Sequence, residues 1–272
     1  MLFSLDGFRC FAEVLGTGHP LVCIHGGFGL DHSYFRPWLD PLSRDLQLIL
    51  LDVRGHGRGD PLPRESFRID AVVADLEAIR QQLGIDRWAL LGHSGGGLVA
   101  GSYVAAHPER TSHFIVVGGF PQFPFVAPRW IGMAQHLKDR RILNGFKMFT
   151  DGVTTDVEYR EACLRIAPLF FADPHRADVA PFERIIYRVH PFLEATTRYS
   201  GYDVGPRVTA YRGPALLLHG DQDYRVPIVE TRKWQTFLPQ AQLVTLPDAG
   251  HFPFIEQGPE ICRILHEFVT TQ

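Results

Sequence analysis

The chain has 272 residues, with 27 Lys and Arg against 30 Asp and Glu, so its formal net charge is -3. Neither sign forms a long block, which excludes a nucleic-acid face and a polybasic membrane anchor and leaves a small-molecule substrate as the expected partner. No apolar run is long enough to span a bilayer, and Asp6 and Arg9 interrupt the N-terminus, so no signal peptide is expected. Four scattered cysteines indicate buried free thiols in a reducing cytoplasm. Nothing in the sequence indicates an oligomeric state.

Apolar runs bounded by turn residues alternate with helix-like segments along both flanks of the chain. Several runs are continuously apolar, which is typical of parallel strands covered on both faces. The expected strands are 8–14, 21–25, 46–52, 88–91, 114–117, 215–219 and 243–246, and the expected helices are 69–83, 97–106, 229–238 and 260–269. This order predicts an α/β fold with a mostly parallel, doubly wound sheet.

The alternation stops between residues 119 and 212. Pro- and Phe-rich turns replace it, with helix-like stretches at 128–148, 157–170 and 181–189. We interpret this part as an inserted helical cap over the carboxyl ends of the strands, where α/β sheets place their ligands. The expected division is therefore a first part of the core at 1–118, a helical cap at 119–212 and a second part of the core at 213–272.

Ser94 lies at the centre of the sequence Gly92-His93-Ser94-Gly95-Gly96, between an apolar run and a helix-like segment. A sharp turn there crowds the backbone, so glycines on both sides leave room while the serine hydroxyl points out of the fold. The pattern predicts a nucleophile elbow with Ser94 as the nucleophile.

A serine hydroxyl needs a base within hydrogen-bond reach and an acid that orients the base. The run at 215–218 leads into a loop with Asp221 and Asp223, and a later loop presents His251 three residues after Asp248. Asp223 is favoured as the acid, Asp221 is the alternative, and Asp248 is interpreted as a turn residue. Three other histidines are interpreted as structural, namely His25, His56 and His219. Because no His, Cys and carboxylate group has metal-site spacing, no metal or cofactor is expected.

Together these motifs resemble the α/β-hydrolase superfamily, and they are most similar to its capped branch that contains proline iminopeptidases. The matching segments are 25–29, 52–57, 92–96, 220–227 and 250–251. The resemblance implies that Ser94 is the nucleophile, His251 the general base and then acid, and Asp223 the group that orients the imidazole. It also implies that the backbone N–H groups of Gly27 and Gly95 form an oxyanion hole.

The substrate pocket is expected to be apolar. Phe28 and Phe120 each follow a strand end that the fold places near Ser94, so they are predicted to border the pocket and to favour an apolar acyl or alcohol group.

An aminopeptidase needs carboxylates near its pocket to hold a free ammonium. In the proline iminopeptidase family a glutamate directly follows the catalytic aspartate, and here that position is Tyr224. Glu194 and Glu183 are candidates for a second family glutamate from the late cap, or else solvated helix residues. The expected function is a carboxylesterase-type serine hydrolase of small apolar esters that forms an acyl-enzyme. The alternatives are an aminopeptidase, a lactonase and a ligand receptor on a hydrolase fold.

Overall fold

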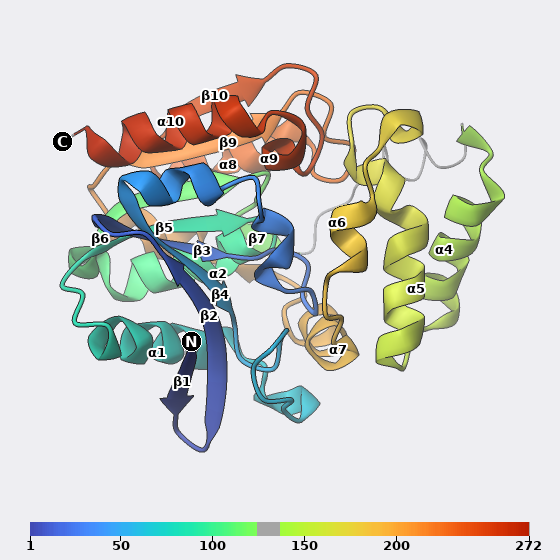
Figure 1. Ribbon diagram of the computed structural model, residues 1–272, viewed down its shortest axis with the longest axis horizontal. Helices are drawn as coiled ribbons and strands as arrows, with labels where there is room; N and C mark the ends of the chain where they lie inside the picture. The colour runs from blue at the N-terminus through green and yellow to red at the C-terminus, as the bar shows by residue number, and fades with distance from the viewer. Residues whose placement is uncertain (124–136, 272) are drawn as a thin grey trace.

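The computed structural model describes residues 1–123 and 137–271, in which an eight-stranded sheet is flanked by helices (Figure 1). Its strands are β1 Leu2–Leu5, β2 Phe8–Leu15, β3 His19–Ile24, β4 Leu46–Asp52, β5 Trp88–His93, β6 Thr111–Val117, β9 Ala215–Gly220 and β10 Gln242–Leu246. They follow the order β1-β2-β4-β3-β5-β6-β9-β10. β2 pairs antiparallel with β1 and β4, and every pair from β4 to β10 is parallel. The predicted α/β fold and its seven strands are confirmed, and β1 was not predicted.

Helices cover both faces of this sheet (Figure 1). The helices of the core are α1 Ile69–Gln82, α2 Gly96–Ala106, α8 Ile228–Phe237, α9 Pro253–Glu256 and α10 Gly258–Thr270. In Figure 1, α1 and α2 lie on one side of the sheet and α10 lies on the other. Within the described parts of the chain, no helix combines the length and the apolar character needed to cross a bilayer.

The alternation of side chains along each strand divides the core into two layers. Ile49 of β4 belongs to the buried cluster that includes Leu76 of α1, whereas the next residue, Leu50, belongs to the cluster that includes Leu265 of α10. Successive side chains of a strand point to opposite faces, so a strand that is covered on both faces needs apolar residues at successive positions. This explains why the central strands read as continuous apolar runs.

Residues between β6 and β9 form a separate group of helices at one end of the sheet (Figure 1). They are α4 Arg140–Asp151, α5 Asp156–Ile166, α6 Ala180–Glu183 and α7 Val189–Arg198, with a small sheet of β7 Gln122–Phe123 and β8 Tyr202–Asp203. The helix expected at 157–170 is present as α5 followed by a 3-10 turn at Ala167–Phe170. Of the helix expected at 128–148, residues 128–136 lie outside the described residues, and α4 covers the rest from Arg140.

The helix expected at 181–189 is wrong, because α6 ends at Glu183 and α7 begins only at Val189. After a last turn bond from the Ile185 N–H to the Phe182 carbonyl, the backbone between them bonds to the core. The N–H of Ile186 donates to Asp31 Oδ2 at 2.9 Å, and the N–H of Arg188 donates to the Gly29 carbonyl at 2.8 Å. These bonds attach the segment between β6 and β9 to the loop after β3. The division at residues 118 and 212 stays a prediction.

A buried pair of side chains joins the end of β4 to the loop after β3. His32 Nδ1 lies 2.6 Å from Asp52 Oδ1, and both side chains are fully buried. Asp52 Oδ2 also accepts the backbone N–H of Arg58 at 2.9 Å. Burial by itself raises the pKa of Asp52, but the bond and charge of His32 outweigh it and lower that pKa to about 2. Burial lowers the pKa of His32, and Asp52 reverses this and raises it above its ordinary value. The pair therefore folds in its charged form.

We predict that Asp52→Asn lowers the free energy of unfolding at pH 5.5 by about 3 to 5 kcal/mol, because it leaves the buried, charged His32 without an opposite charge beside it. The contribution of a depressed carboxyl is present above its unfolded pKa of about 3.9 and is lost as the pH falls toward its folded pKa. The difference between wild type and variant should therefore shrink from pH 5.5 to pH 3 in urea unfolding.

The matched control is Asp86→Asn, because the Asp86 side chain is 82% exposed in its pair with Arg110. It should change stability far less than Asp52→Asn at either pH. A wild-type-to-Asp52→Asn difference that does not vary with pH would contradict the charged pair.

Candidate active site

Ser94 lies in a sharp turn between β5 and α2. Its backbone φ is 51°, in the left-handed region, which residues other than glycine seldom occupy. A Cβ at Gly96 would lie 2.4 Å from the Ile24 carbonyl oxygen, and one at Gly92 would lie 2.5 Å from the Gly96 carbonyl oxygen. Both glycines are therefore needed where β3, β5 and α2 approach one another.

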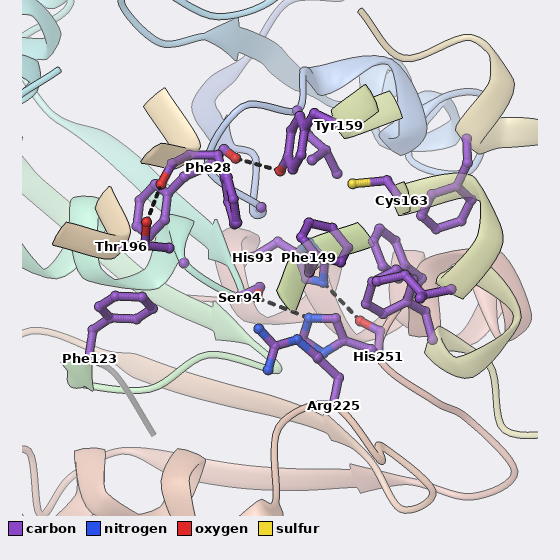
Figure 2. Close-up of a pocket in the computed structure, with 18 of the residues that line it drawn as sticks. Phe28, His93, Ser94, Phe123, Phe149, Tyr159, Cys163, Thr196, Arg225 and His251 are labelled. Atoms are coloured by element: carbon purple, nitrogen blue, oxygen red, sulfur yellow. Dashed lines mark hydrogen bonds between the residues drawn. The ribbon is translucent and has the colours of Figure 1, made fainter. Parts of the chain in front are cut away.

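The loops after β9 and β10 bring an acid and a histidine to this turn. His251 Nε2 lies 2.9 Å from Ser94 Oγ, and His251 Nδ1 lies 2.7 Å from Asp223 Oδ2 (Figure 2 shows the first contact). Because the carboxylate can only accept at Nδ1, the Nδ1 atom carries the proton and Nε2 is free to accept from the serine hydroxyl. Asp223 Oδ1 accepts the backbone N–H groups of Arg225 and Val226 at 2.8 Å each, which fixes the carboxylate.

The two glycines predicted to form an oxyanion hole line the same cavity as Ser94. Gly27 follows β3, and Gly95 is the N-cap residue of α2. The N-terminus of a helix presents N–H groups and a partial positive charge.

A chain of hydrogen bonds beneath the turn joins three loops. The N–H of Gly26 donates to Tyr34 Oη at 2.5 Å, Tyr34 Oη lies 2.9 Å from His93 Nδ1, and His93 Nε2 lies 2.8 Å from the His251 carbonyl oxygen. Burial and the neighbouring His251 hold the pKa of His93 well below its usual range, so its ring is neutral. A neutral ring fits this chain, since Nε2–H donates and Nδ1 accepts. No local pattern around Tyr34 indicates this hydrogen-bonding role, so the sequence analysis missed it.

The Ser94 hydroxyl faces a cavity of about 300 Å³ (Figure 2). Half of its described lining residues are Phe or Tyr, and they come from the core and from the segment between β6 and β9. The aromatic rings belong to Phe28, Phe120, Phe123, Phe146, Phe149, Tyr159, Phe170, Phe182, Phe192 and Phe252. The cavity therefore suits an apolar group beside the serine.

Of the four residues predicted for the pocket, Phe28 and Phe120 line this cavity, and Glu194 and Tyr224 are not among its described lining residues. Glu194 is buried and bonded to Arg198, and Arg64 Nε donates to its Oε2 at 3.0 Å. Tyr224 Oη lies 3.4 Å from Gln222 Oε1.

Asp223, and neither the alternative acid Asp221 nor the expected turn residue Asp248, is bonded to His251 Nδ1. Asp221 and Asp248 are exposed, and Asp248 Oδ1 accepts from Gln222 at 3.3 Å. The three histidines interpreted as structural are buried, with Nδ1 contacts to Gly26 O for His25, to Arg54 O for His56 and to Thr231 Oγ1 for His219. In residues 1–123 and 137–271, no three His, Cys, Asp or Glu side chains are grouped so that they could hold a metal ion.

Comparison with known proteins places these features in a family context. Residues 19–257 match the family described as alpha/beta hydrolase fold. A protein of Bacillus subtilis (strain 168), whose name proposes a 2-succinyl-6-hydroxy-2,4-cyclohexadiene-1-carboxylate synthase, is 28% identical, with 98% of this chain and 96% of that protein aligned. A pimeloyl-(acyl-carrier protein) methyl ester esterase of Chromobacterium violaceum is 29% identical, with 96% of this chain and 98% of that protein aligned.

Solved structures show the same fold. An esterase from Exiguobacterium antarcticum superposes with a TM-score of 0.79 at 19% identity, covering 99% of this chain and 98% of the esterase. Proline iminopeptidases are also among the similar proteins. The similar proteins support a hydrolase activity, and they include both esterases and peptidases.

We predict that Tyr34→Phe lowers the free energy of unfolding by about 1 to 3 kcal/mol, because it leaves the buried Gly26 N–H and His93 Nδ1 without a partner. Urea unfolding measures the change. The control is Tyr224→Phe, which removes a half-buried hydroxyl with one long contact. Equal losses in the two variants would show that the hydrogen bonds of Tyr34 beneath the turn do not contribute more to stability than an ordinary hydroxyl contact.

Proposed function

This chain belongs to the alpha/beta hydrolase fold family, and we propose that it is a serine hydrolase that cleaves small apolar carboxylic esters. The observation that carries the proposal is the continuous line of hydrogen bonds from Ser94 through His251 to Asp223 at the wall of an aromatic cavity. Such a line supplies a nucleophile, its base and the group that orients the base.

In the proposed reaction, Ser94 Oγ attacks the ester carbonyl carbon while its proton passes to His251 Nε2. The bond to the alcohol oxygen then breaks, and the alcohol leaves with that proton, so the acyl group stays on Ser94. A water molecule next gives a proton to His251 and attacks the acyl carbon. The acid leaves, and Ser94 recovers its proton. Asp223 keeps the imidazole in one tautomer and stabilises its protonated form in both steps.

In this proposal the backbone N–H groups of Gly27 and Gly95 bind the carbonyl oxygen while it carries negative charge. Loss of one such donor typically costs about 2.7 to 4 kcal/mol of transition-state stabilisation. Their position supports the role, because both residues line the cavity at Ser94 and Gly95 lies at the N-terminus of α2. A side-chain substitution cannot remove a backbone donor, so these two residues are not tested by deletion.

The lining of the aromatic cavity favours an ester over an aminopeptidase substrate. A free ammonium needs a carboxylate near the scissile bond, and no Asp or Glu is among the described residues that line the cavity. Glu194 is bonded to Arg64 and Arg198, and Glu183 is exposed. Lactone opening would use the same groups as ester hydrolysis, and a ligand receptor on this fold would bind without turnover.

We predict that aryl esters of short and medium chain length are hydrolysed, and that prolyl and alanyl arylamides stay intact. Ser94→Ala should lower kcat by about 10³-fold or more, because the acyl-enzyme no longer forms. Steady-state release of the aryl alcohol or arylamine measures both rates.

The control variant is Ser200→Ala, which changes an exposed serine of the segment between β6 and β9 and should keep wild-type rates. Preferential cleavage of the arylamides would overturn the esterase proposal in favour of an aminopeptidase. One equivalent of aryl alcohol released without further turnover would favour a receptor.

The two aspartates of one loop offer a second test. Asp223→Asn should lower kcat by about 10⁴-fold, because an amide can stabilise the wrong imidazole tautomer. Asp221→Asn changes the same kind of group two residues away, on an exposed side chain, and should keep wild-type kcat. A large loss of kcat in Asp221→Asn with little loss in Asp223→Asn would reassign the orienting acid.

A further inference from the structure

Arg225 brings a positive charge to the wall of the aromatic cavity. It lies in the loop after β9, two residues after Asp223, and its side chain is among those that line the cavity. Figure 2 shows its side chain among those drawn around the cavity that Ser94 and His251 also line. Its backbone N–H donates to Asp223 Oδ1 at 2.8 Å, so the position of this residue is tied to the orienting acid.

Two hydroxyl groups of the described lining donate to backbone carbonyls. Tyr159 Oη donates to the Phe28 carbonyl at 2.7 Å, and Thr196 Oγ1 donates to the Phe192 carbonyl at 3.0 Å. Among the described lining residues, Arg225 carries the one permanent charge, and none is a carboxylate. The charge of the described lining is therefore positive.

A positive charge in such a place acts strongly on a bound molecule. Burial lowers the pKa of Arg225, and the nearby Asp223 and Tyr159 raise it. A guanidinium keeps its proton even so, because its ordinary pKa lies far above neutral pH. Aromatic walls keep water away and lower the local dielectric, so the interaction with an opposite charge is stronger than it is in water.

We propose that Arg225 binds a carboxylate at the far end of the acyl chain, so that the preferred substrates are half-esters of dicarboxylic acids. The proposal rests on the esterase function above and names its substrate class. The acyl chain stays on Ser94 through both steps of the reaction, so a group that anchors it acts in both. The alcohol leaves first, and the second step adds water to the acyl carbon and releases a dicarboxylate.

Three aryl esters of similar chain length test the proposal. They are the half-ester of adipic acid, a neutral ester in which an isopropyl group replaces the terminal carboxylate, and the ester of aminohexanoic acid, which carries a terminal ammonium. After subtraction of spontaneous hydrolysis, the wild-type kcat/KM should be highest for the anionic ester and lowest for the cationic ester. An order with the anionic ester at or below the neutral one would overturn the proposal.

Arg225→Met should lower the ratio of kcat/KM between the anionic and neutral esters by about tenfold or more, the usual weight of a hydrogen bond to a charged group. Arg225→Lys should retain part of the ratio, because it keeps the charge and loses the planar fork. The control Arg263→Met removes a charge from an exposed side chain of α10 and should leave the ratio unchanged.

The outcomes separate this proposal from the esterase function. An unchanged ratio in Arg225→Met would assign Arg225 a structural role and overturn the carboxylate site, while Ser94-dependent hydrolysis of the neutral ester would still support the esterase. Absence of Ser94-dependent hydrolysis of any ester would instead remove the esterase function itself. If Arg225→Met does not fold, the wild-type order of the three esters decides the proposal.

Discussion

The left-handed backbone at Ser94 is the constraint on which the rest of the site depends. It forces β3, β5 and α2 so close together that a Cβ at Gly96 would lie 2.4 Å from the Ile24 carbonyl oxygen. The same turn places the serine hydroxyl at the edge of the sheet where the parallel strands end. The loops after β9 and β10 leave the sheet at the same edge, so Asp223 and His251 reach Ser94 from short connections.

Buried hydrogen bonds hold these loops in position in the absence of a bound substrate. His93 joins the Ser94 turn to the His251 backbone, Tyr34 joins His93 to Gly26, and backbone N–H groups hold Asp223 from the other side. Groups that are already oriented need little reorganisation during a reaction, which is a main source of catalytic power. The aromatic walls lower the local dielectric, so the charge of Arg225 interacts more strongly with an opposite charge than it would in water.

The sequence predicted the parts of this arrangement that depend on local patterns. Apolar runs indicated the strands, and glycine spacing indicated the turn at Ser94. It missed contacts between distant residues: Tyr34 lies 59 residues from His93, and Arg64 lies 130 residues from Glu194, which it holds outside the cavity. The error at 181–189 has the same cause, because the helix ends at Glu183 and the N–H groups of Ile186 and Arg188 bond to the loop after β3.

The most direct test of the account is covalent labelling with a fluorophosphonate, followed by intact-mass and peptide mass spectrometry. Such a reagent reacts with a serine that an adjacent base activates and leaves a stable phosphonyl group. The account predicts one phosphonyl group per chain, located on Ser94, with loss of ester hydrolysis in proportion to labelling. Labelling at another residue, or full activity in chains labelled at Ser94, would contradict it.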